Sequence, residues 1–320
     1  MPLSEFALIK QYFQQQSVSR KDVNKGIGDD CALLTMPVNT ELAVSTDTLV
    51  ADVHFFADVD PFTLGHKALA VNLSDLAAMG AIPAWVSLAI TLPQAEQAWL
   101  ESFANGFMGL AEYYDLQLIG GDTTKGPLSI TVTIHGHVPQ GKSLRRDQAK
   151  PGDWLYVSGT VGDAAAGLAQ LQQKLQLVQP EYFINRLQQP SPRIMVGAAL
   201  RPIASSCIDI SDGLAQDLQH ILDSSGCGAV VDLEKIPVHE HLKDLSFEQQ
   251  IQLALAGGDD YELLFSVPEE KKSLLQSVQQ QSGVPLTCIG RLQAGAPTLT
   301  FKHLGQPQQL NLAGWDHFTS

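Results

Sequence analysis

The chain has 320 residues, of which 44% are hydrophobic and 17% are charged. At roughly 100–200 residues per domain, this length predicts two domains and excludes a single small module. The 34 acidic residues outnumber the 20 basic ones and give a net charge of −14. Duplex nucleic acid and anionic membranes are therefore not expected partners, because both are bound mainly through Lys and Arg. A chain of this charge that handles phosphate would need metal ions.

The cysteines and the N-terminus indicate a reducing, cytoplasmic setting. The four cysteines are widely spaced and form no Cys-x-x-Cys pair, so neither a zinc ribbon nor a disulfide framework is predicted. The segment MPLSEFALIKQYF lacks the basic start and apolar stretch of a signal peptide. Residues 77–92 are the most apolar stretch, but Gly80 and Pro83 interrupt it, so no membrane span is expected.

Helix and strand patterns alternate along the first half of the chain. An alanine-rich segment there predicts a buried helix, with Pro61 near its start and Gly80 at its end. The remaining patterns are amphipathic helices and short strands, and two of the strands adjoin acidic turns. The predicted helices are 4–16, 61–81 and 94–115, and the predicted strands are 31–34, 42–45, 84–92, a strand leading into 120–122, and 128–138.

The segment Lys150-Pro151-Gly152-Asp153 marks the predicted boundary between an N-terminal domain, 1–150, and a C-terminal domain, 151–320. The second half continues the alternation, which favours an α/β or α+β fold. Its predicted helices run through the Gln-rich stretch 170–179, over 193–201, after Asp212, over 247–256 and before a final strand pair, and its other strands are 154–158, 229–233 and 261–267.

Four turns, two in each half, share one small motif, a Gly-Asp or Asp-Gly pair beside further polar or glycine residues. Both residues are common in turns, so independent origin and weak internal duplication are both open interpretations. The four turns are Gly28-Asp29-Asp30, Gly121-Asp122, Ser211-Asp212-Gly213 and Gly258-Asp259-Asp260.

Six aspartates lie at or near the ends of predicted elements, beside small or hydroxyl residues. A single acidic turn is more often structural than catalytic, but six such carboxylates with few nearby bases would repel one another without a cation. Oxygen ligands of this kind suit Mg²⁺. The candidate metal ligands are Asp30, Asp47, Asp75, Asp122, Asp209 and Asp212, helped by Ser45 and Thr46.

Asp75 lies inside the helix predicted to be buried, where an unpaired carboxylate would be costly. Asn72 is three residues earlier and therefore shares its helix face. This polar spot is either a satisfied polar pair or part of a metal site.

Several short segments are candidates for binding phosphate or substrate. The segment 136–143 (GHVPQGKS) has the letters Gly-x-x-x-x-Gly-Lys-Ser, but no helix is predicted directly after it, so a Walker-type nucleotide site is not predicted. Gly26-x-Gly28 is too short for a dinucleotide fingerprint. Arg146 belongs to the one Arg-Arg pair and is either a phosphate contact or an exposed residue. His54 is a substrate contact, a base or a packed loop residue. His135-x-His137 lacks an evident third ligand for zinc, and no Ser-His-Asp arrangement is indicated.

Taken together, six separated motifs closely resemble those of bacterial thiamine-monophosphate kinases, in the same order. The resemblance runs from near residue 4 to Phe318. One departure is Asp259, where that family often has Glu, which shortens the side chain and keeps its charge. The motifs are 26–32 (GIGDDCA), 45–50 with His54-Phe55 (STDTLV and HF), 72–81 (NLSDLAAMGA), 120–124 (GGDTT), 209–214 (DISDGL) and 257–263 (GGDDYEL).

The resemblance implies a two-domain fold of the aminoimidazole ribonucleotide synthetase superfamily. It implies a homodimer whose N-terminal sheets join across the dimer axis, with the C-terminal domain completing the active-site cleft. ATP and thiamine monophosphate would be the substrates and several Mg²⁺ ions the cofactors. The ATP contacts would be Asp30, Gly121, Asp122, Arg146 and Ser211, and the thiamine end would contact His54, Asp259 and Trp315.

The implied reaction makes thiamine diphosphate, in the last step of its biosynthesis, by direct in-line transfer of the γ-phosphoryl group of ATP. Two phosphates repel one another, so metal ions must offset charge before attack. No catalytic base is needed because a phosphate monoester is largely ionised near neutral pH (second pKa about 6). A Mg²⁺-dependent phosphatase and a non-catalytic metal- or nucleotide-binding protein are the alternatives.

Overall fold

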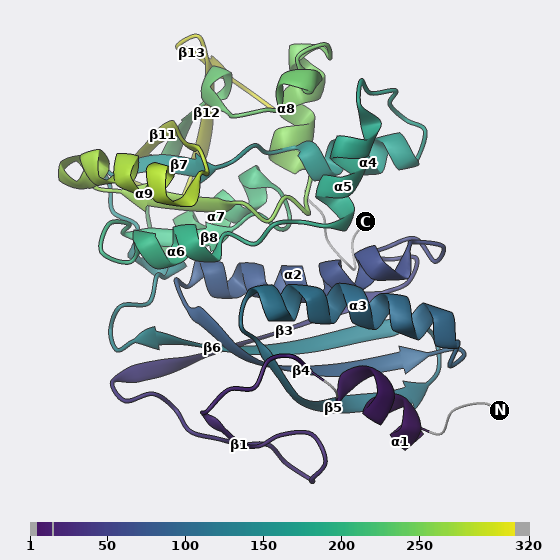
Figure 1. Ribbon diagram of the computed structural model, residues 1–320. Coiled ribbons are helices and arrows are strands. Elements are labelled where there is room, and N and C mark those ends of the chain that lie inside the picture. The colour runs from purple at the N-terminus through teal and green to yellow at the C-terminus, as the bar shows by residue number, and fades with distance from the viewer. Residues whose placement is uncertain (1–4, 15, 311–320) are drawn as a thin grey trace. The chain divides into compact units, whose positions relative to one another are not determined.

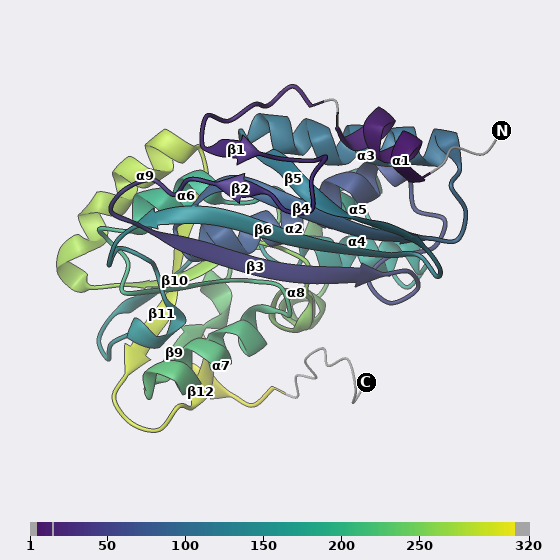
Figure 2. The same ribbon diagram turned by 90° about the horizontal axis from the view of Figure 1, so that it is seen from below.

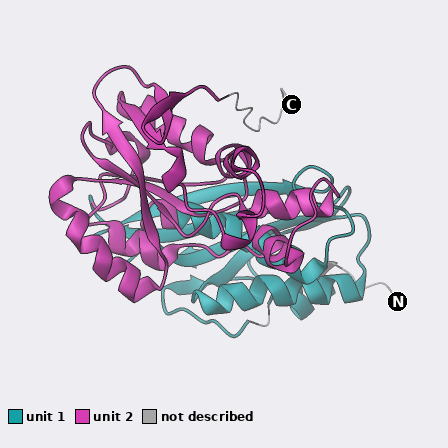
Figure 3. Ribbon diagram, turned by 90° about the horizontal axis from the view of Figure 1, so that it is seen from above, with its two compact units in different colours: residues 1–76, 81–141 teal, residues 77–80, 142–320 magenta. Residues whose placement is uncertain are grey.

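The computed structural model describes residues 5–14 and 16–310. The chain divides into two units, which Figure 3 distinguishes by colour. Unit 1 comprises Met1–Leu76 and Ala81–Gly141, and unit 2 comprises Ala77–Gly80 and Lys142–Ser320.

Unit 1 is built on a four-stranded mixed sheet with the order β3-β6-β4-β5. The pairs β3–β6 and β6–β4 are antiparallel, whereas β4 and β5 are parallel. One face of this sheet is covered by the helices α2 and α3 (Figure 1). The strands are β3 (Thr40–Val50), β4 (Ile82–Leu92), β5 (Gln117–Lys125) and β6 (Ser129–Pro139), and the helices are α2 (Pro61–Ala78) and α3 (Gln97–Tyr113).

Two glycines allow α2 and α3 to pack closely. A Cβ atom on Gly65 would lie 2.1 Å from the carbonyl oxygen of Phe103, and one on Gly106 would lie 1.9 Å from that of Phe62. No larger residue fits at either position without moving a helix backbone. The two helices therefore form a fixed layer above the sheet.

The N-terminal segment covers other parts of unit 1. It begins with α1 (Glu5–Leu8) and a π-helix, η1 (Ile9–Phe13), and it continues into the short pair β1 (Val23–Lys25) and β2 (Leu33–Leu34). Figure 2 shows this pair beside the sheet. The Trp85 indole, completely buried, donates a hydrogen bond to Asp22 at 3.0 Å, so the segment closes over a small apolar cluster.

Unit 2 contains a seven-stranded sheet with the order β13-β12-β9-β11-β7-β10-β8, antiparallel except for the β12–β9 pair. Its main core joins the sheet to the apolar sides of α7 and α8. The strands are β7 (Trp154–Ser158), β8 (Ser206–Asp209), β9 (Gly228–Asp232), β10 (Leu263–Val267), β11 (Leu286–Gln293), β12 (Leu299–His303) and β13 (Gln306–Gln308). The helices are α4 (Asp163–Leu171), α5 (Pro180–Gln188), α6 (Ile194–Leu200), α7 (Leu214–Ser225), α8 (Phe247–Ala256) and α9 (Leu275–Ser282), with 3-10 turns η2 (Arg146–Gln148), η3 (Leu233–Lys235), η4 (Glu240–Leu242) and η5 (Glu269–Leu274).

The elements match the sequence predictions at several places and differ at others. Strand 154–158 and helix 247–256 have the predicted bounds. The helix predicted to run through the Gln-rich stretch ends instead at Leu171, and Gln173 and Gln179 both take a left-handed backbone with φ 58°. Within the described residues, no helix is both long enough and apolar enough to cross a bilayer.

Candidate functional site

In unit 1, strand β3 and helix α2 hold a group of polar side chains between them. The Ser45 hydroxyl donates to Asp75 Oδ2 at 2.5 Å. The Asn72 side-chain oxygen accepts a hydrogen bond from the backbone N–H of Asp47 at 3.2 Å, while its amide donates to the carbonyl of Ala68 at 3.1 Å. Asn72 and Asp75 therefore share the α2 face that lies over β3, as the helix spacing predicts. The group offers two carboxylates and a hydroxyl in one place.

Thr46 does not join this group through its side chain. Successive residues of a strand point to opposite faces, and β3 extends past the predicted end at Ser45 to Val50. The Thr46 hydroxyl consequently lies on the other face, 2.9 Å from the hydroxyl of Thr133. Of Ser45, Thr46 and Asp47, only the first and third direct side chains toward α2.

A cavity of about 490 Å³ within unit 1 brings together three other predicted site residues. Asp30, Gly121 and Asp122 line it, together with apolar side chains such as Phe13 and Leu88. Gly121 has a φ of 155° and, with a Cβ atom, would meet the Leu88 carbonyl oxygen at 1.8 Å, so a side chain is excluded there. The cavity wall therefore combines carboxylates and backbone polar groups with apolar carbon.

The β3 and β5 strands are at opposite edges of the four-stranded sheet, so Asp47 and Asp122 lie on different strands with two others between them. Three inter-strand spacings amount to roughly 14 Å of sheet. Unit 1 by itself therefore holds two acidic groups, one at each edge: Asp47 with Asp75, and Asp30 with Asp122.

His54 follows β3 in a tight turn. Its Nδ1 accepts a hydrogen bond from the backbone N–H of Val50 at 3.0 Å. This bond requires Nδ1 to be without a proton, which leaves the proton of a neutral imidazole on Nε2. His54 is half-buried, so the turn fixes the ring rather than leaving it as a freely moving loop residue.

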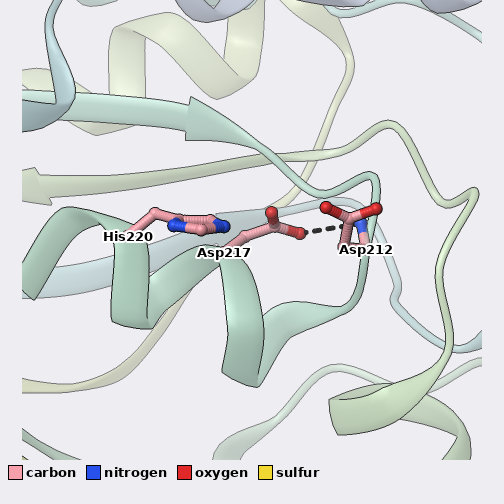
Figure 4. A group of neighbouring side chains, drawn as sticks. All are labelled: Asp212, Asp217 and His220. Atoms are coloured by element: carbon pink, nitrogen blue, oxygen red, sulfur yellow. Dashed lines mark hydrogen bonds between the residues drawn. The ribbon is translucent and has the colours of Figure 1, made fainter. Parts of the chain in front are cut away.

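In unit 2, Asp209 is the last residue of β8, the turn after this strand carries Ser211 and Asp212, and α7 begins directly after the turn. Asp217 on the first turns of α7 holds this turn in place (Figure 4). Its Oδ2 accepts hydrogen bonds from three consecutive backbone N–H groups, those of Ser211, Asp212 and Gly213, each at 3.1 Å. The buried Asp217 thus fixes the backbone from which Asp212 projects.

Asp217 and its neighbours form a compact acidic group with one histidine. One ligand atom each of Asp212, Asp217 and His220 lies within 4.8 Å of the others (Figure 4). Burial, together with the charges of Asp209 and Asp212, raises the pKa of Asp217 to about 8. A cation bound here would lower that pKa again, because it would compensate the same charges.

The Gly257–Glu262 turn lies against the Asp209–Gly213 turn. The Asp259 N–H donates to the Ser211 carbonyl at 2.8 Å, and the Tyr261 N–H donates to the Ile210 carbonyl at 2.9 Å. A Cβ atom on Gly258 would lie 2.3 Å from the same Ser211 oxygen, which explains a glycine at this close approach. The two acidic turns of unit 2 are therefore one hydrogen-bonded assembly.

Glu262, the last residue of this assembly, is the centre of an ion network that the sequence analysis did not predict. The completely buried Glu262 carboxylate accepts hydrogen bonds from Arg186 at 2.9 Å, from Arg193 at 2.7 Å and from the Ser158 hydroxyl at 2.6 Å. Arg186 also pairs with the buried Asp163 at 3.5 Å. The partners come from sequence-distant elements, so no local spacing could have identified them.

Asp217 and His220 are the other residues that the sequence analysis missed, and here a signal was present. Both follow Asp212 on a predicted helix, and their spacing of three places them on one helix face.

Arg146 lies exposed in η2. Trp315 lies outside the described residues.

Comparison with known proteins defines first the class and then the family. Residues 28–138 match the family described as AIR synthase related protein, N-terminal domain, and residues 150–302 match the corresponding C-terminal domain. Within that class, the chain belongs to the thiamine-monophosphate kinase family and is a phosphotransferase. The resemblance inferred from the motifs and the expected fold class are both confirmed.

Three relatives show how far the similarity extends. The thiamine-monophosphate kinase of Escherichia coli (strain K12) is 54% identical over 324 residues, covering 100% of both chains. The crystal structure of the Stenotrophomonas maltophilia K279a thiamine-monophosphate kinase is 43% identical with a TM-score of 0.86, covering 96% of this chain and 99% of that one. A structure described as "AaThiL complexed with AMPPCP and TMP" is 32% identical with a TM-score of 0.77, covering 92% and 93%.

Proposed function

We propose that this protein phosphorylates thiamine monophosphate with ATP to give thiamine diphosphate, the last step of that cofactor's biosynthesis. The observation that carries this proposal is the full-length similarity to thiamine-monophosphate kinases. A relative bound to AMPPCP and TMP supports ATP and thiamine monophosphate as the substrates.

We further propose that the transfer is direct and in-line and that several Mg²⁺ ions assist it. The donor set fits magnesium, because the Ser45 hydroxyl and the Asp75 carboxylate already share a hydrogen bond on one side of β3. In unit 1, Asp47 and Asp75 would hold metal near the β3 edge, and Asp30 and Asp122 would do so at the cavity. When bound, magnesium offsets phosphate charge and orients the phosphate oxygens.

In unit 2, Asp209 and Asp212 would hold metal as well, with Asp217 fixing the turn that carries them. Gly121 and Ser211 would contact ATP phosphates, and Thr46, whose hydroxyl faces Thr133, would act through its carbonyl oxygen. No residue is assigned as a base, because the acceptor phosphate is already ionised near neutral pH. The residues of this chain would therefore bind and orient two anionic substrates and their metal ions.

One assay separates this proposal from its alternatives. The protein is incubated with ATP, Mg²⁺ and thiamine monophosphate, and the products are separated. Thiamine diphosphate with stoichiometric ADP supports the kinase. Inorganic phosphate without thiamine diphosphate would indicate a phosphatase, and unchanged substrates would indicate a binding protein.

Arg146 is proposed to pair with phosphate oxygens of ATP, since its guanidinium is exposed in η2 and can donate two parallel hydrogen bonds. Replacing Arg146 with Ala should weaken ATP use by at least tenfold, about 1.4 kcal/mol in kcat/KM. Steady-state kinetics with ATP varied will measure this. An unchanged ATP dependence would leave Arg146 as a surface residue only.

A homodimer through the N-terminal sheet is also proposed. β3 is an edge strand, and the face turned away from α2 exposes half of Leu42 and Val44, beside the paired hydroxyls of Thr46 and Thr133. An exposed sheet edge with an apolar face favours pairing with a second copy. In light scattering at micromolar concentration, wild type should have twice the chain mass, and Val44→Lys should shift it toward the monomer. A monomeric wild type would contradict the proposal.

The thiamine end of the substrate is proposed to contact His54, Asp259 and Trp315. His54 offers a fixed Nε2–H, and Asp259 is a half-buried carboxylate that complements the thiazolium charge. Trp315 would stack on the cationic ring.

A cytoplasmic location is proposed as well, in keeping with the four free cysteines.

A further inference from the structure

We propose that Tyr261 is a positioning residue that orients the Asp259 carboxylate toward the thiamine end of the substrate. The Tyr261 hydroxyl donates a hydrogen bond to Asp259 Oδ1 at 2.9 Å. Tyr261 is 8% exposed, whereas Asp259 is half-buried and accessible. This inference rests on the proposed role of Asp259 as a substrate contact and adds the residue that sets its geometry.

The backbone around this pair is unusual. Asp259 and Tyr261 both take the left-handed conformation, with φ of 67° and 52°. Such a conformation is unfavourable at a residue other than glycine and persists only where the surroundings stabilise it. The hydrogen bonds that the Asp259 and Tyr261 N–H groups donate to the Ser211 and Ile210 carbonyls stabilise this backbone conformation.

The residue between them, Asp260, faces a different set of groups. It is 1% exposed, and its two oxygens accept from the N–H groups of Gly162, at 2.6 Å, and Ala164, at 3.1 Å, at the start of α4. The anchoring of the turn thus depends on Asp260 and on main-chain bonds. None of these bonds involves the Tyr261 hydroxyl, so the turn keeps them when that hydroxyl is removed.

The hydrogen bond from the Tyr261 hydroxyl instead restricts the side chain of Asp259. An aspartate has two rotatable side-chain bonds, and a hydrogen bond to one oxygen restricts the arrangements that they can take. A carboxylate held in its binding position loses less entropy when a cationic ligand arrives. This gain appears in the affinity for the thiamine substrate and not in the phosphoryl-transfer step.

The test is Tyr261→Phe, which deletes one oxygen atom and keeps the ring. We expect the KM for thiamine monophosphate to rise about fivefold, with kcat and the ATP KM within twofold of wild type. The matched control is Tyr156→Phe in the same unit, because the Tyr156 hydroxyl forms a hydrogen bond with Cys288 and lies outside both the acidic turns and the Glu262 ion network. That control should leave all three constants unchanged.

A double-variant cycle with Asp259→Asn makes the assignment specific. Asp259→Asn alone should raise the same KM more than Tyr261→Phe does. The double variant should be no worse than Asp259→Asn, because no carboxylate then remains for Tyr261 to orient. Additive effects would overturn the proposal.

The remaining outcomes separate the two assignments. If Asp259→Asn leaves the KM for thiamine monophosphate unchanged, Asp259 is not a substrate contact and both assignments are wrong. If Asp259→Asn raises it but Tyr261→Phe does not, only the positioning role is wrong. A lower melting temperature of Tyr261→Phe with unchanged kinetic constants would likewise show a structural role instead.

Discussion

Asp47→Asn is expected to abolish phosphoryl transfer while the protein stays folded. The substitution keeps the shape of the side chain and removes one negative charge from the β3 group proposed to hold magnesium. The bond from the Asp47 backbone N–H to Asn72 and the bond from Ser45 to Asp75 do not use the Asp47 carboxylate, so both remain possible in the variant. We expect kcat/KM to fall at least about 1000-fold, on the order of 4 kcal/mol.

The control is Glu41→Gln, which removes a carboxylate charge from the same strand. Glu41 is exposed and accepts a hydrogen bond from the Gly141 N–H at 3.0 Å, a bond that Gln can still accept. The Glu41→Gln variant should retain wild-type turnover with the wild-type dependence on Mg²⁺. Full activity of Asp47→Asn at ordinary Mg²⁺ would remove Asp47 from the metal site, and recovery at high Mg²⁺ would show that affinity for the ion was lost.

The surroundings of Asp47 show what local sequence spacing can predict. The shared face of Asn72 and Asp75 follows from a helix period of 3.6 residues, and the structure confirms it by placing both over β3. The direction of Thr46 was not predicted because the strand was expected to end at Ser45. β3 continues to Val50, and strict alternation then turns Thr46 to the opposite face.

Unit 2 shows what local sequence spacing cannot predict. The sequence predicted its acidic turns from Gly-Asp and Asp-Gly pairs, since those residues accept turn geometry. The contact between the two turns could not be predicted, because it is made by backbone groups 48 positions apart, Ser211 and Asp259. The helix α5 (Pro180–Gln188) was not predicted either: the helix expected through the Gln-rich stretch 170–179 ends at Leu171, and α5 begins after a left-handed Gln179.

Glu262→Gln is expected to give the largest loss of stability among single substitutions in the acidic turn Gly257–Glu262. Glu262 has no exposed surface, and the guanidiniums of Arg186 and Arg193 are only 12% and 18% exposed. Gln has nearly the same volume but turns an N–H₂ group toward donors, so Arg193 loses its ion pair with Glu262 and Arg186 keeps its pair with Asp163. Removing one partner of a buried ion pair costs about 3–5 kcal/mol.

The comparison variant is Asp232→Ala, which breaks the exposed pair of Asp232 with Lys235 at 2.7 Å in the same unit. Exposed pairs contribute about 0–1 kcal/mol, so this change should barely register. Hydrogen exchange of the β7 and β10 amides is the suitable measurement, because a chain of two units need not unfold in one transition. Protection in Glu262→Gln within about 1 kcal/mol of wild type would show that the network is not needed for stability.

The same substitution should also affect substrate binding, because Glu262 ends the segment that carries Asp259. The Glu262 carbonyl accepts from the Ile210 N–H at 2.8 Å, next to the bonds that join Asp259 and Tyr261 to the neighbouring turn. If the ion network fixes this segment, Glu262→Gln should raise the KM for thiamine monophosphate together with exchange at β10. Faster exchange with an unchanged KM would mean that the backbone bonds to Ile210 and Ser211 alone suffice to hold the Asp259 turn.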